Sequence, residues 1–189
     1  ADANYHVVPS PFNFQQATLE IPAAAVEATN ADVHTLAIID DLPNLIDPGE
    51  GTLVLFSSRR QMLDVFEELP EALRDITLVQ GDSSKQEMLV QHKKAIDSGA
   101  GSVLFGLASF AEGVDLPGKY CTHVIIAKLP FAVPDDPIEA SLSEWIEARG
   151  GNAFMEITVP DASLKLIQAC GRLLRTESDT RKISLLDRR

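Results

Sequence analysis

A segment near the C-terminus carries three polar side chains whose spacing suits phosphate chemistry. Gln168, Arg172 and Arg175 stand at positions i, i+4 and i+7, which fall within a narrow arc of one helix face. The opposite arc is apolar and consists of Leu166, Ile167, Cys170, Leu173 and Leu174. Two guanidinium groups on one face suit a polyanion such as a phosphate chain, because each offers a planar fork of donors. The common alternative is a solvated polar face.

Gly171 in the middle of this segment favours the ligand interpretation. Glycine costs about 1 kcal/mol relative to alanine inside a helix, and its presence indicates a close approach of backbone. The sequence predicts a helix over 161–175, preceded by Pro160 and capped by Asp161.

Two loops that follow predicted strands offer further ligand groups. Ser57, Ser58, Arg59 and Arg60 come directly after an apolar run, and hydroxyls with backbone N–H groups at a helix start suit a phosphate. Taken alone, they are better explained by an ordinary helix cap. The second loop, residues 106–118, contains three glycines, two acids and Ser109. It suits a ligand whose hydroxyls or water a carboxylate would orient, or else a tight turn.

Residues 113–120 imitate a Walker A phosphate-binding loop, G-x-x-x-x-G-K-[ST], at all positions except the last. Tyr120 stands where a serine or threonine should hold Mg²⁺. Asp115 would put a negative charge into the phosphate cradle, and Pro117 removes a backbone donor. We therefore reject this segment as a nucleotide cradle.

The elements that must position these groups alternate between strand and helix. Apolar or β-branched runs predict strands at 52–57, 75–80, 102–106, 122–127 and 183–186, with helices at 59–69, 83–98 and 161–175. This alternation predicts an α/β fold with a mainly parallel sheet and helices on both faces.

Two regions depart from the alternation. Residues 1–50 are irregular, with extended pieces framed by prolines and a helix from about 31 to 46 that Pro43 bends or breaks. Residues 130–151 leave the sheet as an insertion that contains an amphipathic helix around Trp145. The whole chain reads as one domain.

Composition limits the remaining functions. With 189 residues, 45% of them apolar, and a net charge of −12, the chain is globular and does not bind nucleic acid over its whole surface. No apolar run spans a bilayer and no signal peptide is visible. Cys121 and Cys170 lack metal-ligand spacing, which favours a reducing, cytoplasmic location. Neither do the four histidines form a ligand pair.

An arginine-bearing helix and a glycine-rich acidic loop on a parallel sheet, without a phosphate cradle, match the second half of a two-lobed phosphoryl-transfer motor. From Ser10 to Arg188 the chain resembles the second motor domain of the DinG family of superfamily-2 DNA helicases, which are relatives of XPD. Residues 53–58 resemble motif IV, residues 109–115 motif V and residues 168–175 motif VI.

The resemblance implies a RecA-like, three-layer fold of the P-loop NTPase type and assigns roles to the motif residues. It places Gln168, Arg172 and Arg175 at the ATP γ-phosphate, with Arg175 as the arginine finger. It implies that Glu112, Gly113 and Asp115 couple the nucleotide cleft to the DNA track. It gives contacts with the single-stranded DNA backbone to Ser57, Ser58, Arg59 and Ser109.

The resemblance also implies partners that this chain lacks. ATP and Mg²⁺ would be held mainly by an N-terminal motor domain of the same protein, where an iron–sulfur cluster would also lie. We therefore expect an excised C-terminal fragment, inactive alone, of a cytoplasmic helicase that moves 5′→3′ in DNA repair. Two alternatives stay open: a non-catalytic RecA-like scaffold, and a translocase that does not unwind.

Overall fold

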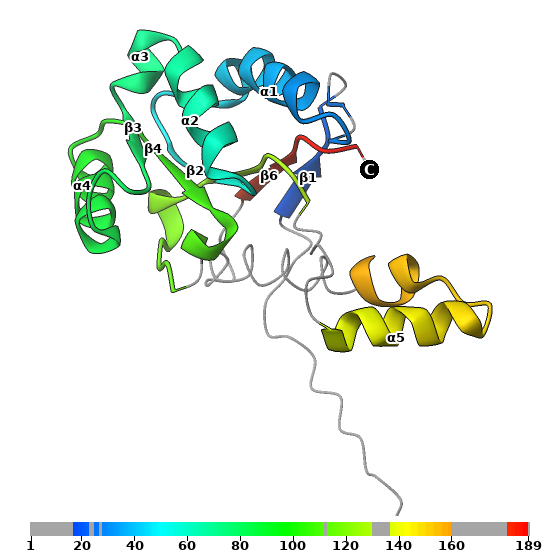
Figure 1. Ribbon diagram of the computed structural model, residues 1–189. Coiled ribbons are helices and arrows are strands. Elements are labelled where there is room, and N and C mark those ends of the chain that lie inside the picture. The colour runs from blue at the N-terminus through cyan, green and yellow to red at the C-terminus, as the bar shows by residue number, and fades with distance from the viewer. Residues whose placement is uncertain are drawn as a thin grey trace, which may run out of the picture.

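Six parallel strands form the centre of the protein (Figure 1). The computed structural model describes residues 17–22, 25–26, 28–111, 113–129, 137–159 and 181–188. The strand order is β1-β6-β5-β2-β4-β3, and each neighbouring pair is parallel. The strands are β1 Ala17–Glu20, β2 Gly51–Phe56, β3 Thr77–Val79, β4 Ser102–Leu107, β5 His123–Ile126 and β6 Arg181–Leu185. The parallel sheet confirms the predicted fold class.

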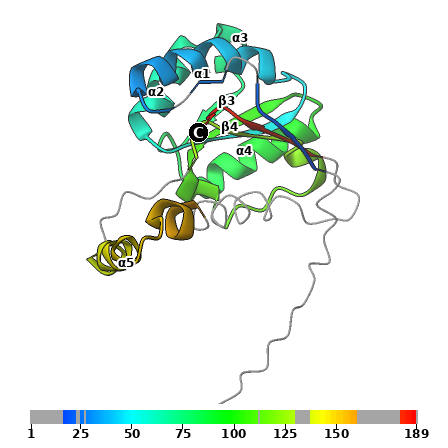
Figure 2. The ribbon, with the colours of Figure 1, turned by 90° about the vertical axis from the view of Figure 1, so that its right-hand side faces the viewer.

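Helices cover both faces of this sheet, so the fold has three layers (Figure 2). Three helices lie on one face, namely α1 (Ala31–Leu45), α2 (Arg59–Glu68) and α3 (Glu71–Arg74). On the other face lies α4 (Lys85–Asp97), which begins with a capping box between Ser84 and Glu87. Short 3₁₀ helices η2 (Ala108–Ala111) and η3 (Gly118–Tyr120) follow β4.

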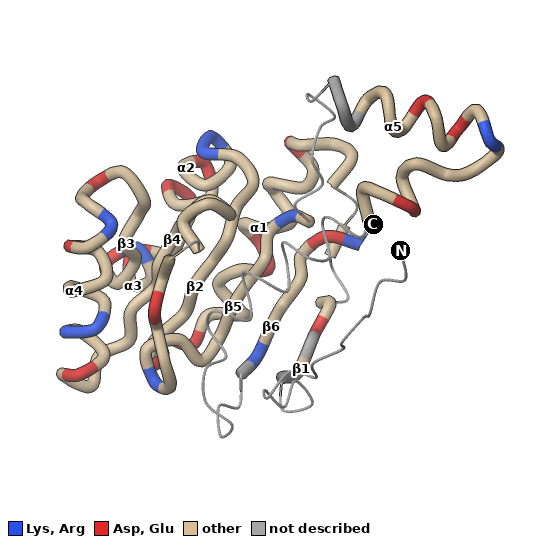
Figure 3. Tube along the Cα trace, turned by 90° about the horizontal axis from the view of Figure 1, so that it is seen from below, with Lys and Arg blue, Asp and Glu red and all other residues tan. Residues whose placement is uncertain are grey.

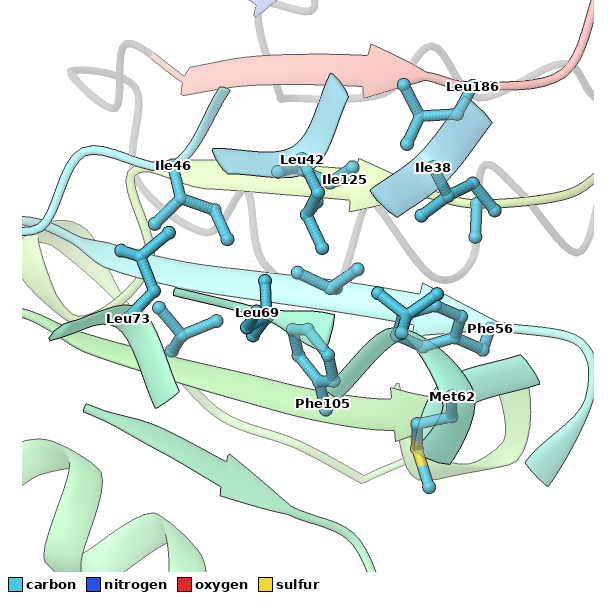
Figure 4. Close-up of a cluster of buried hydrophobic side chains, with 14 of the residues drawn as sticks. Ile38, Leu42, Ile46, Phe56, Met62, Leu69, Leu73, Phe105, Ile125 and Leu186 are labelled. Atoms are coloured by element: carbon cyan, nitrogen blue, oxygen red, sulfur yellow. The ribbon is translucent and has the colours of Figure 1, made fainter. Parts of the chain in front are cut away.

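Alternation along β2 divides the core between the two faces. Val54 and Phe56 belong to the cluster that α1 and α2 cover, shown in Figure 4. Leu53 and Leu55 belong to the cluster on the opposite face, with Met88 from α4. All six residues of β2 are buried, as expected for a strand that is covered on both sides.

Helix α1 continues through Pro43, so the predicted break is wrong. Proline removes one helical hydrogen bond and crowds the carbonyl four residues earlier. Here Pro43 stands in the last turn, and Ile46 still donates to the Leu42 carbonyl at 3.1 Å. The helix therefore loses one bond close to the end that it reaches anyway.

The N-terminal region contributes a strand that the sequence did not predict as one. β1 pairs with β6 in the register Thr18↔Lys182, and Lys182 Nζ lies 2.8 Å from Glu20 Oε2. Only four residues long, β1 gives too little periodicity to identify. The helix predicted around Trp145 is present as α5 (Pro137–Ala148), which lies apart from the sheet (Figure 1), and a π-helix, η4 (Phe154–Thr158), follows it.

Candidate functional site

The carboxyl edge of the sheet brings together the serines predicted to contact DNA. Phe56 at the end of β2 stands opposite Leu107 at the end of β4. Ser57 and Ser109, which follow these strands by one and two residues, therefore start neighbouring loops at one edge. Ser57, Ser58 and Ser109 are exposed. The fold thus places three hydroxyls at the ends of β2 and β4, where the predicted contacts with a DNA strand require them.

Ser58 is the N-cap of α2, as the simpler alternative required. Its hydroxyl oxygen accepts from the Gln61 backbone N–H at 3.5 Å, a long capping bond. The oxygen serves as acceptor there, so the hydroxyl hydrogen stays able to donate to an anion. No acidic side chain lies in the first turn of α2, so the positive end of the helix dipole is not neutralised locally.

Arg59 reaches from α2 across to the end of β3. Its Nη1 donates to the Gln80 carbonyl at 3.4 Å, and Gln80 Oε1 accepts from the Leu107 backbone N–H at 2.7 Å. Gly81 makes room for the guanidinium, because a Cβ built there would lie 2.7 Å from Arg59 Nη1. Arg59 thus has a structural role beside the predicted DNA contact, and sequence reasoning missed Gln80.

The loop after η2 alternates between anchored and exposed residues. Val114 and Leu116 are fully buried, whereas Gly113 and Asp115 are exposed. Gly113 has a φ of +74°, a conformation that favours glycine. Two buried apolar anchors therefore hold Gly113 and Asp115 at the surface, where the predicted coupling role needs them.

Four of the predicted site residues lie outside the described residues. These are Gln168, Arg172, Arg175 and Glu112. Their roles stay predictions.

The rejected Walker A segment ends at the amino edge of the sheet. Tyr120, at its end, is next to Gly51, the first residue of β2, since a Cβ on Gly51 would lie 2.6 Å from the Tyr120 carbonyl oxygen. Lys119 pairs with Asp97, with Nζ 2.6 Å from Oδ1, and this hydrogen bond raises the pKa of Lys119. An amine committed to α4 at the amino edge of the sheet agrees with our rejection of a phosphate cradle.

A cavity that the sequence did not reveal opens at the carboxyl edge between α1 and α2. Its volume is about 110 Å³. Both helices contribute the residues near their N-termini, and Lys128 from the loop after β5 completes the wall. The lining consists of Ala31, Asp32, His34, Thr35, Ser57, Ser58, Arg60, Gln61, Asp64 and Lys128. Lys128 joins Ser57 here because β5 lies beside β2, which no local pattern indicates.

Three histidines are buried and hydrogen-bonded within the fold, as expected for core residues. His34 Nε2 lies 3.1 Å from the Leu186 carbonyl oxygen, and His92 Nδ1 lies 2.9 Å from Ser102 Oγ. His123 Nε2 lies 2.8 Å from Ser184 Oγ. Burial, helped by the nearby Lys182 charge, lowers the pKa of His123 to about 4. Burial likewise lowers the pKa of His92.

Within the described part of the chain, no group of three or more His, Cys, Asp or Glu residues is arranged to hold a metal ion. Cys121 is buried, as predicted, and its Sγ lies 3.5 Å from the His123 carbonyl oxygen, whereas Cys170 lies outside the described residues. Among the helices that the structure describes, none has the length and apolarity to cross a membrane.

A parallel three-layer domain whose loops at the carboxyl edge of the sheet carry serines and an acid has the arrangement expected of a motor-type α/β lobe. The chain belongs to the helicase C-terminal domain family, whose model matches residues 43–189. Sequence comparison finds 48% identity over 184 residues with the ATP-dependent DNA helicase DinG of Photobacterium profundum. The DinG protein of Escherichia coli (strain K12) is 34% identical over 185 residues. Each match covers 95% of this chain and 26% of the relative, so the chain spans about a quarter of their length.

Solved structures of superfamily-2 helicases share the fold. An XPD helicase structure aligns with a TM-score of 0.60 and 22% identity over 90% of this chain and 31% of its own. Xpd4 of S. tokodaii gives a TM-score of 0.61 at 16% identity over 91% of this chain and 34% of its own. The C-terminal domain of the DEAD-box protein Dbp5 gives 0.52 at 15% identity, covering 93% of this chain and 79% of its own. These neighbours confirm the RecA-like fold.

Proposed function

We propose that this chain is the second motor lobe of a DinG-type ATP-dependent DNA helicase. The observation that carries the proposal is the convergence of Ser57, Ser58 and Ser109 at the carboxyl edge of a sheet in a helicase C-terminal domain. The 48% identity with a DinG protein over 95% of the chain supports the same activity. The substrate is single-stranded DNA, and the partner is an N-terminal motor lobe of the same protein.

The described loops would bind single-stranded DNA through its phosphates. Exposed hydroxyls of Ser57, Ser58 and Ser109 donate hydrogen bonds to phosphodiester oxygens, and the exposed Arg59 adds a positive charge. Contacts of this kind track the backbone and carry little sequence preference. Gly113 and Asp115, held at the surface by buried neighbours, together with Glu112, transmit closure of the nucleotide cleft to this track.

Arg175 is the proposed arginine finger, with Gln168 and Arg172 beside it at the γ-phosphate. ATP and Mg²⁺ belong mainly to the N-terminal lobe, and Arg175 stabilises the charge that develops on the transferred phosphoryl group. The described residues of this chain offer no set of metal ligands, so an iron–sulfur cluster would also belong to the remainder of the protein. A cytoplasmic role in DNA repair completes the proposal.

Arg175→Lys in the full-length protein tests the proposal. Lysine keeps the charge but loses the planar fork, so DNA-stimulated kcat should fall on the order of 10³-fold, as loss of an arginine finger does. ATP affinity and strand binding should persist, because other residues supply them.

Arg149→Lys is the matched control. Arg149 stacks on Trp145, with its Cζ 4.4 Å from the ring centroid, just after α5 and away from the sheet. Near-normal kcat in both variants would remove Arg175 from catalysis, whereas an unaltered full-length protein without DNA-stimulated turnover would favour a scaffold function. A strand-displacement assay run alongside separates unwinding from translocation alone.

A further inference from the structure

The cavity between α1 and α2 contains a buried acceptor that the fold leaves unsatisfied. Gln61 is 8% exposed and lines this cavity. Its side-chain nitrogen lies 3.2 Å from His34 Nδ1 and 3.1 Å from Thr35 Oγ1. Its Oε1 is buried and has no hydrogen-bond partner among the described residues. Since buried polar atoms in folded proteins are almost always paired, an unpaired acceptor beside a cavity points to a ligand.

The surrounding hydrogen bonds fix which way the Gln61 amide points. His34 Nε2 lies 3.1 Å from the Leu186 carbonyl oxygen, so Nε2 carries the proton and Nδ1 accepts. Thr35 Oγ1 donates to the Ala31 carbonyl at 2.7 Å, so it too can accept from Gln61. Both neighbours therefore require the amide nitrogen on their side. Turning the amide by 180° would place Oε1 against these two acceptors, so Oε1 is the atom that is left without a partner among the described residues.

Lys128 is the cation at the rim of the cavity that a phosphate group can use, because the rim carboxylates Asp32 and Asp64 form no ion pair with it among the described residues. The N-termini of α1 and α2 line the cavity, as do Arg60 and Lys128. Arg60 is partly balanced by Asp64, with Nε 3.6 Å from Oδ2, and Asp32 lies in the first turn of α1. Figure 3 shows one short basic stretch at α2, with acidic residues further along the helix.

The interior requires the opposite chemistry from the rim. A carbonyl oxygen such as Gln61 Oε1 repels phosphate oxygens and needs a group that carries an N–H or O–H. A deoxyribose inside a DNA strand carries neither. Every nucleobase carries at least one N–H on its pairing edge, which is the edge that proteins read when a base is unstacked.

We propose that this cavity takes the edge of one base of the bound strand, and that Gln61 Oε1 accepts a hydrogen bond from a base N–H. Lys128 and the hydroxyls of Ser57 and Ser58 hold the adjoining phosphate. This inference rests on the proposed function, since it adds a base contact to a strand held by its backbone. The contact is compatible with every base, so it adds affinity for the strand and no sequence specificity.

A chemically altered strand tests the base contact without changing the protein. Oligo-deoxythymidine and the same strand built from N3-methyl-deoxythymidine carry equal charge, but the second lacks the thymine N–H. Fluorescence anisotropy with this chain should show binding weakened about 3- to 10-fold by the methyl group, the size of one hydrogen bond. Equal affinity for the two strands would overturn the inference, leave the proposed function standing and mean that the cavity takes only water. Binding of neither strand would overturn both.

Variants then assign the effect to Gln61. Gln61→Met removes the acceptor at similar length and should bind the two strands equally. If the methionine variant does not fold, the comparison of the two strands with the unaltered chain still tests the base contact. The matched control is Gln86→Met, an exposed position on α4, which should behave as wild type. Discrimination that survives in a folded Gln61→Met protein would overturn the assignment.

Discussion

Gly106 ties the packing of the sheet to the loop that bears Ser109. It lies in β4, and a Cβ built on it would stand 2.7 Å from Cγ and Cδ1 of the Phe110 ring. Carbon atoms in good contact are about 3.5–4.0 Å apart, so Gly106→Ala forces Phe110 to move by about 1 Å. Phe110 is 2% exposed, so its ring is surrounded by other core atoms. The strain therefore passes to η2, which contains Ser109.

The expected loss of stability is modest and measurable. Overpacking of this kind costs about 1–3 kcal/mol, and replacing a strand glycine returns about 0.5–1 kcal/mol of backbone entropy. From the middle of both ranges, Gly106→Ala should lower the free energy of unfolding by about 1 kcal/mol, and by at most about 2.5 kcal/mol. For a domain of this size that corresponds to a Tm about 2–4 °C lower, and at most about 10 °C lower. Below the Tm, affinity for single-stranded DNA should fall by about 2- to 10-fold, the value of one displaced hydrogen bond.

Urea unfolding of four proteins decides whether the contact with Phe110 is the cause. Leucine at position 110 is smaller than the ring, so Gly106→Ala should cost little in a Phe110→Leu background, and the double-mutant cycle should show coupling of about 1 kcal/mol. Gly49→Ala is the control, since its Cβ would meet only the end of the Asp47 side chain at 3.3 Å. An equal cost of Gly106→Ala in both backgrounds, or wild-type stability, would refute the reasoning.

Three further predictions concern the chain and the full-length protein. The isolated chain should show no measurable ATPase activity, because the proposed function assigns ATP mainly to an N-terminal lobe; DNA-stimulated turnover that Arg175→Ala abolishes would contradict this. Asp115→Asn in the full-length protein should impair ATPase and strand displacement while leaving Tm nearly unchanged, because Asp115 is exposed; the reverse pattern would indicate a structural turn. The pKa of His123 falls from 6.5 to about 4 on folding, so the unfolded chain takes up the proton first and stability should decline as pH falls from about 6.5 to about 4. Urea unfolding at pH 7 and pH 4.5 measures this decline, which should be smaller in His123→Gln.

The sequence predicted best where burial imposes a simple pattern. Residues 53–56 are all apolar because β2 is covered on both faces, and Ser84 with Glu87 marks the start of α4 through direct hydrogen bonds. The sequence did not predict β1 as a strand, because four residues carry too little periodicity. Its pairing with β6 depends on the whole fold.

The candidate site was predictable only in its local parts. Ser57 and Ser109 follow strands, so a general rule about parallel sheets placed them at one edge. The cavity did not follow from that rule, since Lys128, Gln61 and His34 meet through strand order and helix packing. Gln61 is the first residue after the predicted loop at 57–60, and only its contacts with His34 and Thr35 show which way its amide points.

The position of β1 beside β6 has a consequence for how the domain is assembled. The strand made near the start of this chain finds its partner only when the segment near its end has been synthesised, so the β1–β6 pair has the highest sequence separation in the sheet. Closing such a long loop is entropically costly and slows folding. The strands β2, β4 and β3, whose partners are close in the chain, are expected to form first. Until β6 docks, one side of β5 is an open strand edge, which makes the partly synthesised domain a natural client of chaperones.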